Sequence, residues 1–345
     1  LEDIKAPECF IIEQRLKEEM DIPVFHDDQT GTAVICAAGL INALHISGKK
    51  IEDVKIVLNG AGAAGIACIE LLKSMGARHE NCIVCDTKGV IYQGRTEGMN
   101  QWKSAHAVKT DLRTLEEAMN GADVFLGVSV KGAVTPDMVA SMADNPVIFA
   151  MANPDPEITP EEAHEVRVDA IVATGRSDYP NQVNNVLGFP YLFRGALDIN
   201  ARAINDEMKI ACAEALAELA REDVPDEVAL AYGRNLSFGR DYIIPTPFDP
   251  RLIYRIPPAV AKAGMDTGAA RRPIIDMDAY EVSLKGRMDP TASILRGIHA
   301  RAKAAQARMI FAEGDDVRVL RAAVQYQRSG LGKALVVGRE ADVKE

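Results

Sequence analysis

Short apolar runs separated by polar turns dominate the first two thirds of the chain. The runs begin near Val54, Asn81, Asp123, Pro146 and Ala170 and show no strict alternation. This pattern is typical of strands buried on both faces of a parallel sheet. Segments with helical periodicity and acidic first turns, such as TLEEAMN and TPEEAHEV, lie between them. The pattern predicts a doubly wound, mostly parallel, Rossmann-like α/β sheet.

Helical patterns precede and follow this sheet, and a second unit is predicted at the end of the chain. Residues 1–50 and 197–220 have helical periodicity, whereas residues 266–289 are polar and irregular and favour an interdomain linker. A long basic helix is predicted over 290–309. The segment IFAEGDDVRVLRAAVQYQRSGLGKALVVG then predicts a strand, an acidic loop, a helix and a strand. We therefore expect a second α/β domain to begin after the linker.

A glycine-rich turn follows the first strand and opens a helix that ends at Gly76. Such a unit holds a dinucleotide pyrophosphate on backbone N–H groups at the helix N-terminus. The alternative is a plain strand–helix turn without a ligand. The context favours nucleotide binding, because an acid ends the next strand about 20 residues beyond the last glycine. The predicted cofactor residues are Gly60, Ala61, Gly62, Ala63, Ala64, Gly65, Asp86 and, beyond a further strand, Ser129.

The residues around Asp86 leave the choice between NAD and NADP open. The negative charge of Asp86 favours NAD, because it would repel the 2′-phosphate of NADP unless a cation compensates. Lys88 and Arg95 lie close by in the sequence and could supply that cation.

Four carboxylates near the N-terminus form a candidate metal site: Glu2, Asp3, Asp27 and Asp28. On spacing alone they would be solvated surface charges. However, FHDDQTGTA places two of them between an apolar Phe25 and the start of a helix that looks buried. Ligands made of carboxylates alone suit Mg²⁺ or Mn²⁺. The six histidines are scattered, and His26 and His45 are interpreted as structural.

Three asparagines are candidate ligand donors at strand ends. Asn153 follows a strand in MANPDPE, and Asn184 and Asn185 lie in a mostly apolar segment. Side-chain amides there can donate to a carboxylate or a nicotinamide carboxamide. The alternative is turn chemistry, which is strong for Asn153 because Asn-Pro is a turn signal.

The net charge and the cysteines restrict the kinds of binding partner and the cellular compartment expected for this chain. The net charge of −11 over 345 residues argues against a nucleic-acid surface. No apolar run approaches the length of a transmembrane helix, and no signal peptide is visible. The six cysteines are scattered and mostly lie in apolar segments, which indicates reduced core residues in a cytoplasmic protein. Cys82 and Cys85 would point to opposite faces of a strand, which favours a structural role over a redox or zinc site.

Taken together, these segments resemble the malic enzyme family over roughly residues 1–265. LEDI and FHDDQTGTA resemble its metal-binding segments, NGAGAAGIA its cofactor loop, and ANPDPE and QVNNVLGFP its substrate-side segments. Residues 290–345, above all IFAEGDDVRVLRAA, resemble the start of a phosphotransacetylase domain. Because that fusion is typical of bacterial NADP-dependent malic enzymes, the resemblance implies NADP as cofactor, with NAD as the alternative.

The resemblance implies oxidative decarboxylation of (S)-malate to pyruvate and CO₂. By this analogy Glu2, Asp3 and Asp28 ligate Mg²⁺ or Mn²⁺. Asn153 and Asn185 hold the malate carboxylate, with Asn184 as a second candidate. Asp27 would act as a proton-relay acid or lie behind the metal ligands. The resemblance also implies a homo-oligomer and, through the C-terminal domain, regulation by acetyl-CoA.

The same resemblance implies how the chain is divided. Residues 1–30 would end an N-terminal malic enzyme domain, 31–265 form the NAD(P)-binding domain, 266–289 the linker, and 290–345 the start of the phosphotransacetylase-like domain. The chain begins without methionine and ends just after a strand-like KALVVG, so we expect an internal piece of a longer polypeptide.

The family's general-acid tyrosine and general-base lysine belong to a domain that precedes LEDI. None of Tyr92, Tyr179 and Tyr191 sits in a motif that could replace the tyrosine. We therefore expect this segment alone to be catalytically dead or nearly so.

Three other functions fit parts of the pattern. The first is a metal-independent hydroxy-acid or amino-acid dehydrogenase, against which the carboxylates argue because hydride transfer needs no metal. The second is a non-catalytic module that senses a nucleotide or acetyl-CoA. The third is an acyl-phosphate transferase, which rests on the last segment of the chain alone.

Overall fold

The computed structural model describes residues 1–233, 235–288, 298 and 301–339. The chain divides into two compact units, Leu1–Met277 and Asp278–Glu345. The strands of the first unit are β1 (Ile56–Asn59), β2 (Cys82–Asp86), β3 (Gly89–Val90), β4 (Val124–Gly127), β5 (Val147–Ala150) and β6 (Ile171–Thr174). Its helices are α1 (Glu8–Glu19), α2 (Thr32–Ser47), α3 (Ala63–Ser74), α4 (Gln101–Ser104), α5 (Leu115–Met119), α6 (Pro136–Ala140), α7 (Pro160–Val166), α8 (Phe189–Asp198), α9 (Asp206–Arg221), α10 (Asp226–Tyr232) and α11 (Leu252–Asp266), with short turns η1 (Asp27–Gly31), η2 (His79–Asn81) and η3 (Asn185–Leu187).

The six strands form one sheet in the order β3-β2-β1-β4-β5-β6. All neighbouring pairs are parallel except β2 and β3. The chain moves from β1 to β2 on one side and then returns to β4 on the other, so the strand order reverses between β1 and β4. Ligands of doubly wound sheets bind beyond the carboxyl ends of the strands at such a point. The predicted fold class is confirmed.

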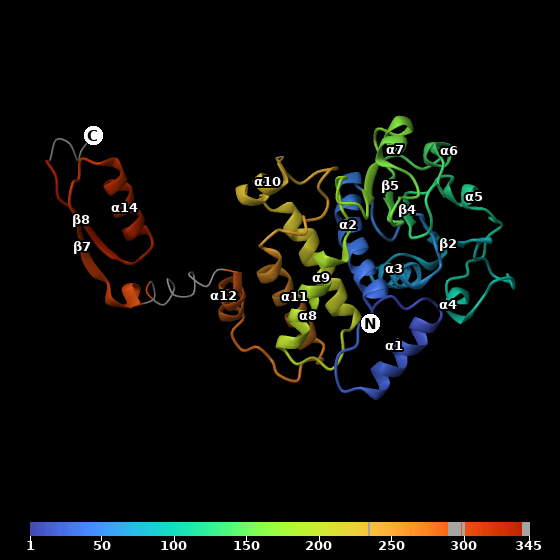
Figure 1. Cartoon of the computed structure of the whole chain (residues 1–345), viewed down its shortest axis with the longest axis horizontal. Coiled ribbons are helices and arrows are strands. Elements are labelled where there is room, and N and C mark those ends of the chain that lie inside the picture. Colours follow the sequence, from blue (N-terminus) through green and yellow to red (C-terminus); the bar gives the residue numbers. More distant parts are fainter. Residues whose placement is uncertain (234, 289–297, 299–300, 340–345) are drawn as a thin grey trace. The chain divides into compact units, whose positions relative to one another are not determined.

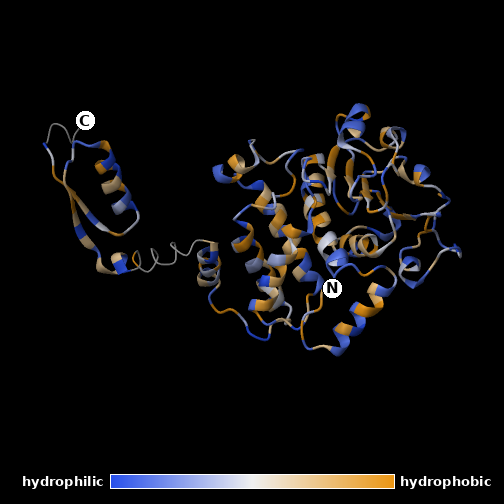
Figure 2. Ribbon diagram, viewed as in Figure 1, coloured by the Kyte–Doolittle hydropathy of each residue, from blue (hydrophilic) through white to orange (hydrophobic). Residues whose placement is uncertain are grey.

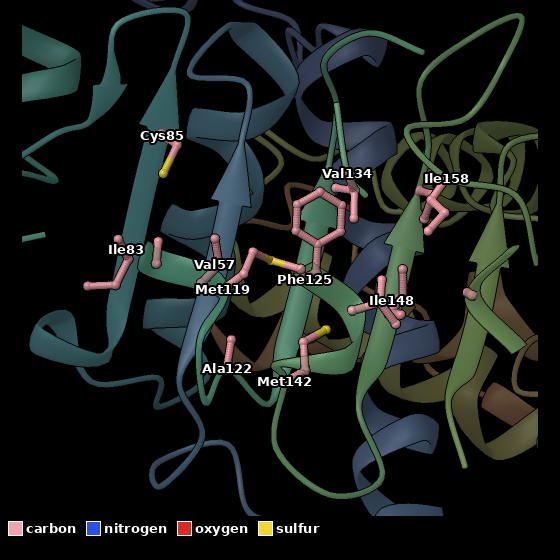
Figure 3. Packing of buried hydrophobic residues seen from close by; sticks show 14 of the residues in the cluster. Val57, Ile83, Cys85, Met119, Ala122, Phe125, Val134, Met142, Ile148 and Ile158 are labelled. Carbon is pink, nitrogen blue, oxygen red and sulfur yellow. The ribbon is translucent and has the colours of Figure 1, made fainter. Parts of the chain in front are cut away.

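Helices cover both faces of the sheet, which explains why its strands are apolar without alternation. On one face, side chains of β1, β2, β4 and β5 pack against α5, α6 and α7 around Phe125, Met119 and Ile148 (Figure 3). Phe125 and Met119 are fully buried, and each such side chain contributes about 1.5–3 kcal/mol to the free energy of folding. Figure 1 shows α2 on the opposite side of the sheet from α5 and α6.

Helix α2 is the central helix of the first unit and packs against α3, α9 and β5. Its residues are hydrophobic around most of the circumference, as Figure 2 shows for α2 and the strands. The prediction that no apolar run approaches transmembrane length is wrong for this helix: among the described residues, Asp27–Ser47 is long and apolar enough to cross a membrane. However, 72% of its apolar window is buried inside the unit. A helix surrounded by protein in this way is the core helix of a globular domain.

The second unit contains a two-stranded parallel sheet of β7 (Ala307–Phe311) and β8 (Gly332–Val336), joined by α14 (Val317–Arg328). The strand, loop, helix and strand predicted there are present. The linker predicted over 266–289 contains helix α12 (Met277–Met288), and the basic helix predicted to reach residue 309 gives way to β7 at Ala307. Most of that predicted helix lies outside the described residues.

Candidate functional site

The N-terminal segment lies alongside the turn that carries Asp27 and Asp28. Asp27 N–H donates to the Leu1 carbonyl at 3.1 Å, and Asp3 N–H donates to Asp28 Oδ2 at 2.9 Å. Carboxylate oxygens of Glu2, Asp3 and Asp28 consequently all lie within 4.8 Å of one another. Burial raises the pKa of Glu2, and repulsion from the three nearby aspartates raises it further. A divalent cation would relieve this repulsion, and the donor set is the one that Mg²⁺ and Mn²⁺ prefer.

Asp27 faces a different partner, although it is next to Asp28 in the sequence. Asn185 Nδ2 donates to Asp27 Oδ2 at 2.9 Å, while Asp27 Oδ1 is buried and has no hydrogen-bond partner among the described residues. Burial raises the pKa of Asp27, and the hydrogen bond from Asn185 opposes part of that rise. A Cβ on Gly31 would overlap Asp27 Oδ1. The turn therefore needs glycine at position 31 to leave room for the carboxylate.

A polar cavity of about 500 Å³ collects the acidic turn and the asparagines. Asn153 reaches it from the end of β5, and Asn184 and Asn185 reach it from the start of η3. Asn184 also caps η3, because its side-chain oxygen accepts from Val186 N–H at 3.0 Å. The residues that line this cavity include Asp27, Asp28, Thr32, Ala64, Ser129, Asn153, Asn184 and Asn185.

The glycine turn has the close packing that its sequence predicts. Gly60 has φ +117°, and a Cβ there would overlap the Val128 carbonyl. A Cβ on Gly65 would overlap the Gly60 carbonyl, so the first turn of α3 can approach β1 only with glycine at position 65. Gly62, in contrast, has free space around its Cβ position. The N-terminus of α3 therefore faces the space beyond the carboxyl ends of the strands, where its N–H groups can bind an anionic ligand.

A cavity of about 700 Å³ lies above this turn, between the ends of β2 and β4. The predicted cofactor residues on its wall are Gly60, Ala61, Gly62, Asp86, Lys88 and Ser129. Lys103 and Arg113, which no sequence motif marks, also line it. Ala63 and Gly65 lie in α3 outside the lining residues, and Ala64 lines the polar cavity instead.

Asp86 is held in a network of cations. Arg95 Nη2 donates to both its oxygens at 2.7 and 2.9 Å, and Lys103 Nζ donates to Oδ2 at 2.7 Å. Burial alone would raise the pKa of Asp86, but the hydrogen bonds from Lys103 and Arg95 outweigh it and lower the pKa. Arg95 is buried beneath Asp86 and also donates to the Gly89, Val90 and Glu97 carbonyls, so it does not line the cavity. No motif marks Lys103, which lies in the polar stretch MNQWKSAH.

His26, interpreted from the sequence as structural, lies directly behind the acidic turn. It is fully buried, and its Nε2 is 2.9 Å from Asp28 Oδ2. Gln29 Nε2 donates to Glu13 Oε2 at 2.8 Å and lies 2.8 Å from His26 Nδ1. An amide nitrogen can only donate, so Nδ1 is the acceptor. Nε2 lies close to Asp28 Oδ2 but makes no well-directed hydrogen bond among the described residues. His26 therefore packs against Asp28, which agrees with the structural role predicted for it.

All six cysteines, which belong to the described part of the chain, are free and buried. Burial raises the pKa of Cys82 to about 11 and of Cys85 to about 12. Both thiols therefore stay protonated at neutral pH, which agrees with the structural role predicted for them.

The sheet, the glycine turn and the two adjoining cavities define a doubly wound dinucleotide-binding domain with an acidic site beside it. The family model "Malic enzyme, NAD binding domain" matches residues 29–232, and the model "Phosphate acetyl/butaryl transferase" matches residues 293–345. The chain belongs to the malic enzyme family. The resemblance in the sequence, including that of the last segment, is confirmed.

Individual relatives agree with this assignment. The chain is 66% identical to an NADP-dependent malic enzyme of Rhizobium meliloti over 346 residues, which is 100% of this chain and 46% of that protein. An NAD-dependent malic enzyme of the same organism is 54% identical over 98% of this chain and 44% of its own length. The crystal structure of the Pyrococcus horikoshii malic enzyme superposes with a TM-score of 0.74 at 39% identity, over 86% of this chain and 69% of that one. The chain spans about half the length of the curated relatives it matches.

Proposed function

We propose that the chain forms the metal- and NADP-binding part of an enzyme that converts (S)-malate to pyruvate and CO₂. The observation that carries this proposal is that Asp28, one member of the acidic cluster, lines the same polar cavity as the three asparagines. This cavity shares Ser129 with the dinucleotide cavity. A substrate bound by the acids would lie next to the cofactor. The names of the similar malic enzymes support the same reaction.

The residues of the acidic site fit a hard divalent cation. We propose that Glu2, Asp3 and Asp28 hold Mg²⁺ or Mn²⁺, which would polarise the C2 oxygen of malate as a Lewis acid. Asn153 and Asn185 would donate to a malate carboxylate. Asp27, whose pKa is raised by burial, can hold a proton at its unpartnered Oδ1 and so act as a relay.

NADP is the proposed cofactor because the charge of Asp86 is already balanced. Arg95 and Lys103 pair with this carboxylate, and Lys88 and Arg113 add positive charge at the cavity wall, although Lys88 also pairs with Glu97. A 2′-phosphate would therefore meet net positive charge. NAD is the alternative, since a relative of similar identity carries the name of an NAD-dependent enzyme.

The acid and base of the reaction are proposed to come from outside this chain. Among the described residues that line the polar cavity there is neither a tyrosine nor a lysine. A missing acid or base costs about 10²–10⁴-fold in rate per group. We therefore propose that the chain binds its ligands by itself but turns over malate very slowly.

Calorimetry on this chain tests the proposal. NADP⁺ should bind, Mn²⁺ should bind with loss of the signal after EDTA, and malate should bind only when Mn²⁺ is present. Nucleotide binding that ignores both metal and malate would instead support the alternative of a non-catalytic sensor. Robust malate-dependent NADPH formation by this chain alone would contradict the proposed division of the catalytic groups.

For the rest of the molecule we propose the domain limits 31–265 and 290–345 together with the linker 266–289. We also propose homo-oligomerisation, which the family resemblance implies. Acetyl-CoA binding is proposed for the phosphotransacetylase-like unit, and the family match over 293–345 supports it. A cytoplasmic location is proposed from the six buried, free cysteines. Binding of acetyl-CoA to this chain, measured by calorimetry, tests the regulatory part.

A further inference from the structure

Glu157 is a fully buried carboxylate in the loop between β5 and α7. Ser129 N–H donates to Glu157 Oε1 at 2.7 Å, and the Ser129 hydroxyl donates to the same oxygen at 2.9 Å. Ala152 N–H donates to Oε2 at 3.0 Å. Lys131 and Arg176 pair with Asp155, and Arg176 pairs more closely with Asp178. The charge of Glu157 is thus stabilised by directed N–H and O–H donors.

These hydrogen bonds join the loops at the carboxyl ends of three strands. Ser129 follows β4 and lines both cavities. Ala152 follows β5 and lines the polar cavity together with Asn153. Asn59, the last residue of β1, donates from Nδ2 to the Ser129 hydroxyl at 3.0 Å. One carboxylate therefore accepts hydrogen bonds both from the loop that the two cavities share and from the loop that carries a proposed malate ligand.

A glycine beside this carboxylate leaves room for it. A Cβ on Gly127, the last residue of β4, would lie 2.6 and 2.7 Å from the two Glu157 oxygens. The backbone of Gly127 needs no positive φ, so its small size rather than its conformation matters here. A buried charge is costly unless every oxygen is well hydrogen-bonded, and glycine at 127 permits that geometry.

We propose that Glu157 is a positioning residue. It aligns the loop after β4, which carries Ser129, with the loop after β5, which carries Asn153. The proposal rests on the proposed function, since it concerns how one end of NADP⁺ meets malate. In doubly wound folds the acid after the second strand lies near the adenosine ribose. Asp86 and Ser129 lie on opposite sides of β1, so Glu157 governs the half of the dinucleotide that carries the nicotinamide.

Glu157→Gln tests this role because it keeps the shape of the side chain. Its amide nitrogen cannot accept a hydrogen bond, so Ser129 N–H or Ala152 N–H loses its partner. The affinity of the chain for NADP⁺ should fall about tenfold, whereas that for 2′,5′-ADP, which lacks the nicotinamide half, should change less than about twofold. Calorimetry measures both, and Glu165→Gln, an exposed glutamate of α7, is the matched control.

Gly127→Ala provides a second variant, which keeps the carboxylate but displaces it, because the added Cβ would lie 2.4 Å from Glu157 Cδ. It should give the same selective loss of NADP⁺ affinity. The inference is overturned if folded variants bind NADP⁺ like the wild type, or if NADP⁺ and 2′,5′-ADP weaken in parallel, as a general structural defect would produce. If the wild-type chain binds 2′,5′-ADP but not NADP⁺, the proposed function fails instead, which is a distinguishable result.

Discussion

The Asn185 side chain donates a 2.9 Å hydrogen bond to the Asp27 carboxylate across 158 residues of sequence. This bond joins the acidic turn before α2 to the asparagine turn before α8. It also satisfies one carboxylate oxygen of Asp27, whereas the other, Oδ1, has no partner among the described residues. The two segments that the sequence suggested separately, as metal and substrate residues, are thus one structural unit.

Replacing Asn185 by alanine should lower the free energy of unfolding by about 1–3 kcal/mol, because a half-buried carboxylate then loses its donor. Chemical denaturation measures the change. Asn184→Ala is the control: it removes only a capping interaction and should cost about 1 kcal/mol or less. Equal effects of the two substitutions would contradict the importance of the Asp27–Asn185 bond.

Asp28→Asn should weaken Mn²⁺ binding at least about tenfold, since it removes one of the three carboxylates that we propose as ligands. Titration calorimetry with Mn²⁺ measures this directly, without any turnover. Glu8→Gln, an exposed acid at the start of α1 outside the cluster, should leave the affinity unchanged. Unaltered binding in Asp28→Asn would show that the ion lies elsewhere.

Lys103→Ala should reduce the affinity for NADP⁺ about tenfold or more and affect NAD⁺ much less. The substitution removes a cation at the cavity wall and leaves Asp86 with less compensation, so a 2′-phosphate meets more repulsion. Lys88→Ala is the comparison, because Lys88 is exposed and pairs with Glu97; its effect should be smaller. The ratio of the two dissociation constants is the readout, and an unchanged ratio in Lys103→Ala would exclude this role.

Two alanine substitutions in the glycine turn should separate fold stability from ligand contact. Gly65→Ala should destabilise the chain by about 1–3 kcal/mol, because its Cβ overlaps the Gly60 carbonyl. Gly62→Ala should leave the stability of the ligand-free chain almost unchanged, since its Cβ position is open. It should nevertheless weaken NADP⁺ binding, because Gly62 lines the cavity. Thermal unfolding and calorimetry on both variants check this contrast.

The stabilising contribution of Asp86 should disappear in acid. Its pKa is lowered in the folded chain, so its contribution is fully present above the unfolded pKa of about 4. It is lost as the pH falls through the lower folded pKa. The difference in unfolding free energy between wild type and Asp86→Asn should therefore be largest near neutral pH and shrink below about pH 4. Asp111→Asn, at an exposed site, should show no such trend.

The sequence by itself determined the local elements of this protein. Apolar runs without alternation predict strands buried on both faces, and the glycine turn after Leu58 predicts the start of α3. Both are local effects of burial and backbone freedom. The acidic and asparagine segments were also recognisable, because the types of side chain available for metal and carboxylate binding are few.

Only the tertiary structure decided which of these residues meet and which act through others. Arg95, predicted near the cofactor, lies beneath Asp86, and Lys103 lines the cavity instead. Glu157 carried no signal because a buried carboxylate is specified by donors from distant loops, here Ser129 and Ala152. Hydrogen bonds between loops far apart in sequence depend on how the strands are ordered in the sheet. Local periodicity predicts the strands themselves, but their spatial neighbours are set by the packing of the whole unit.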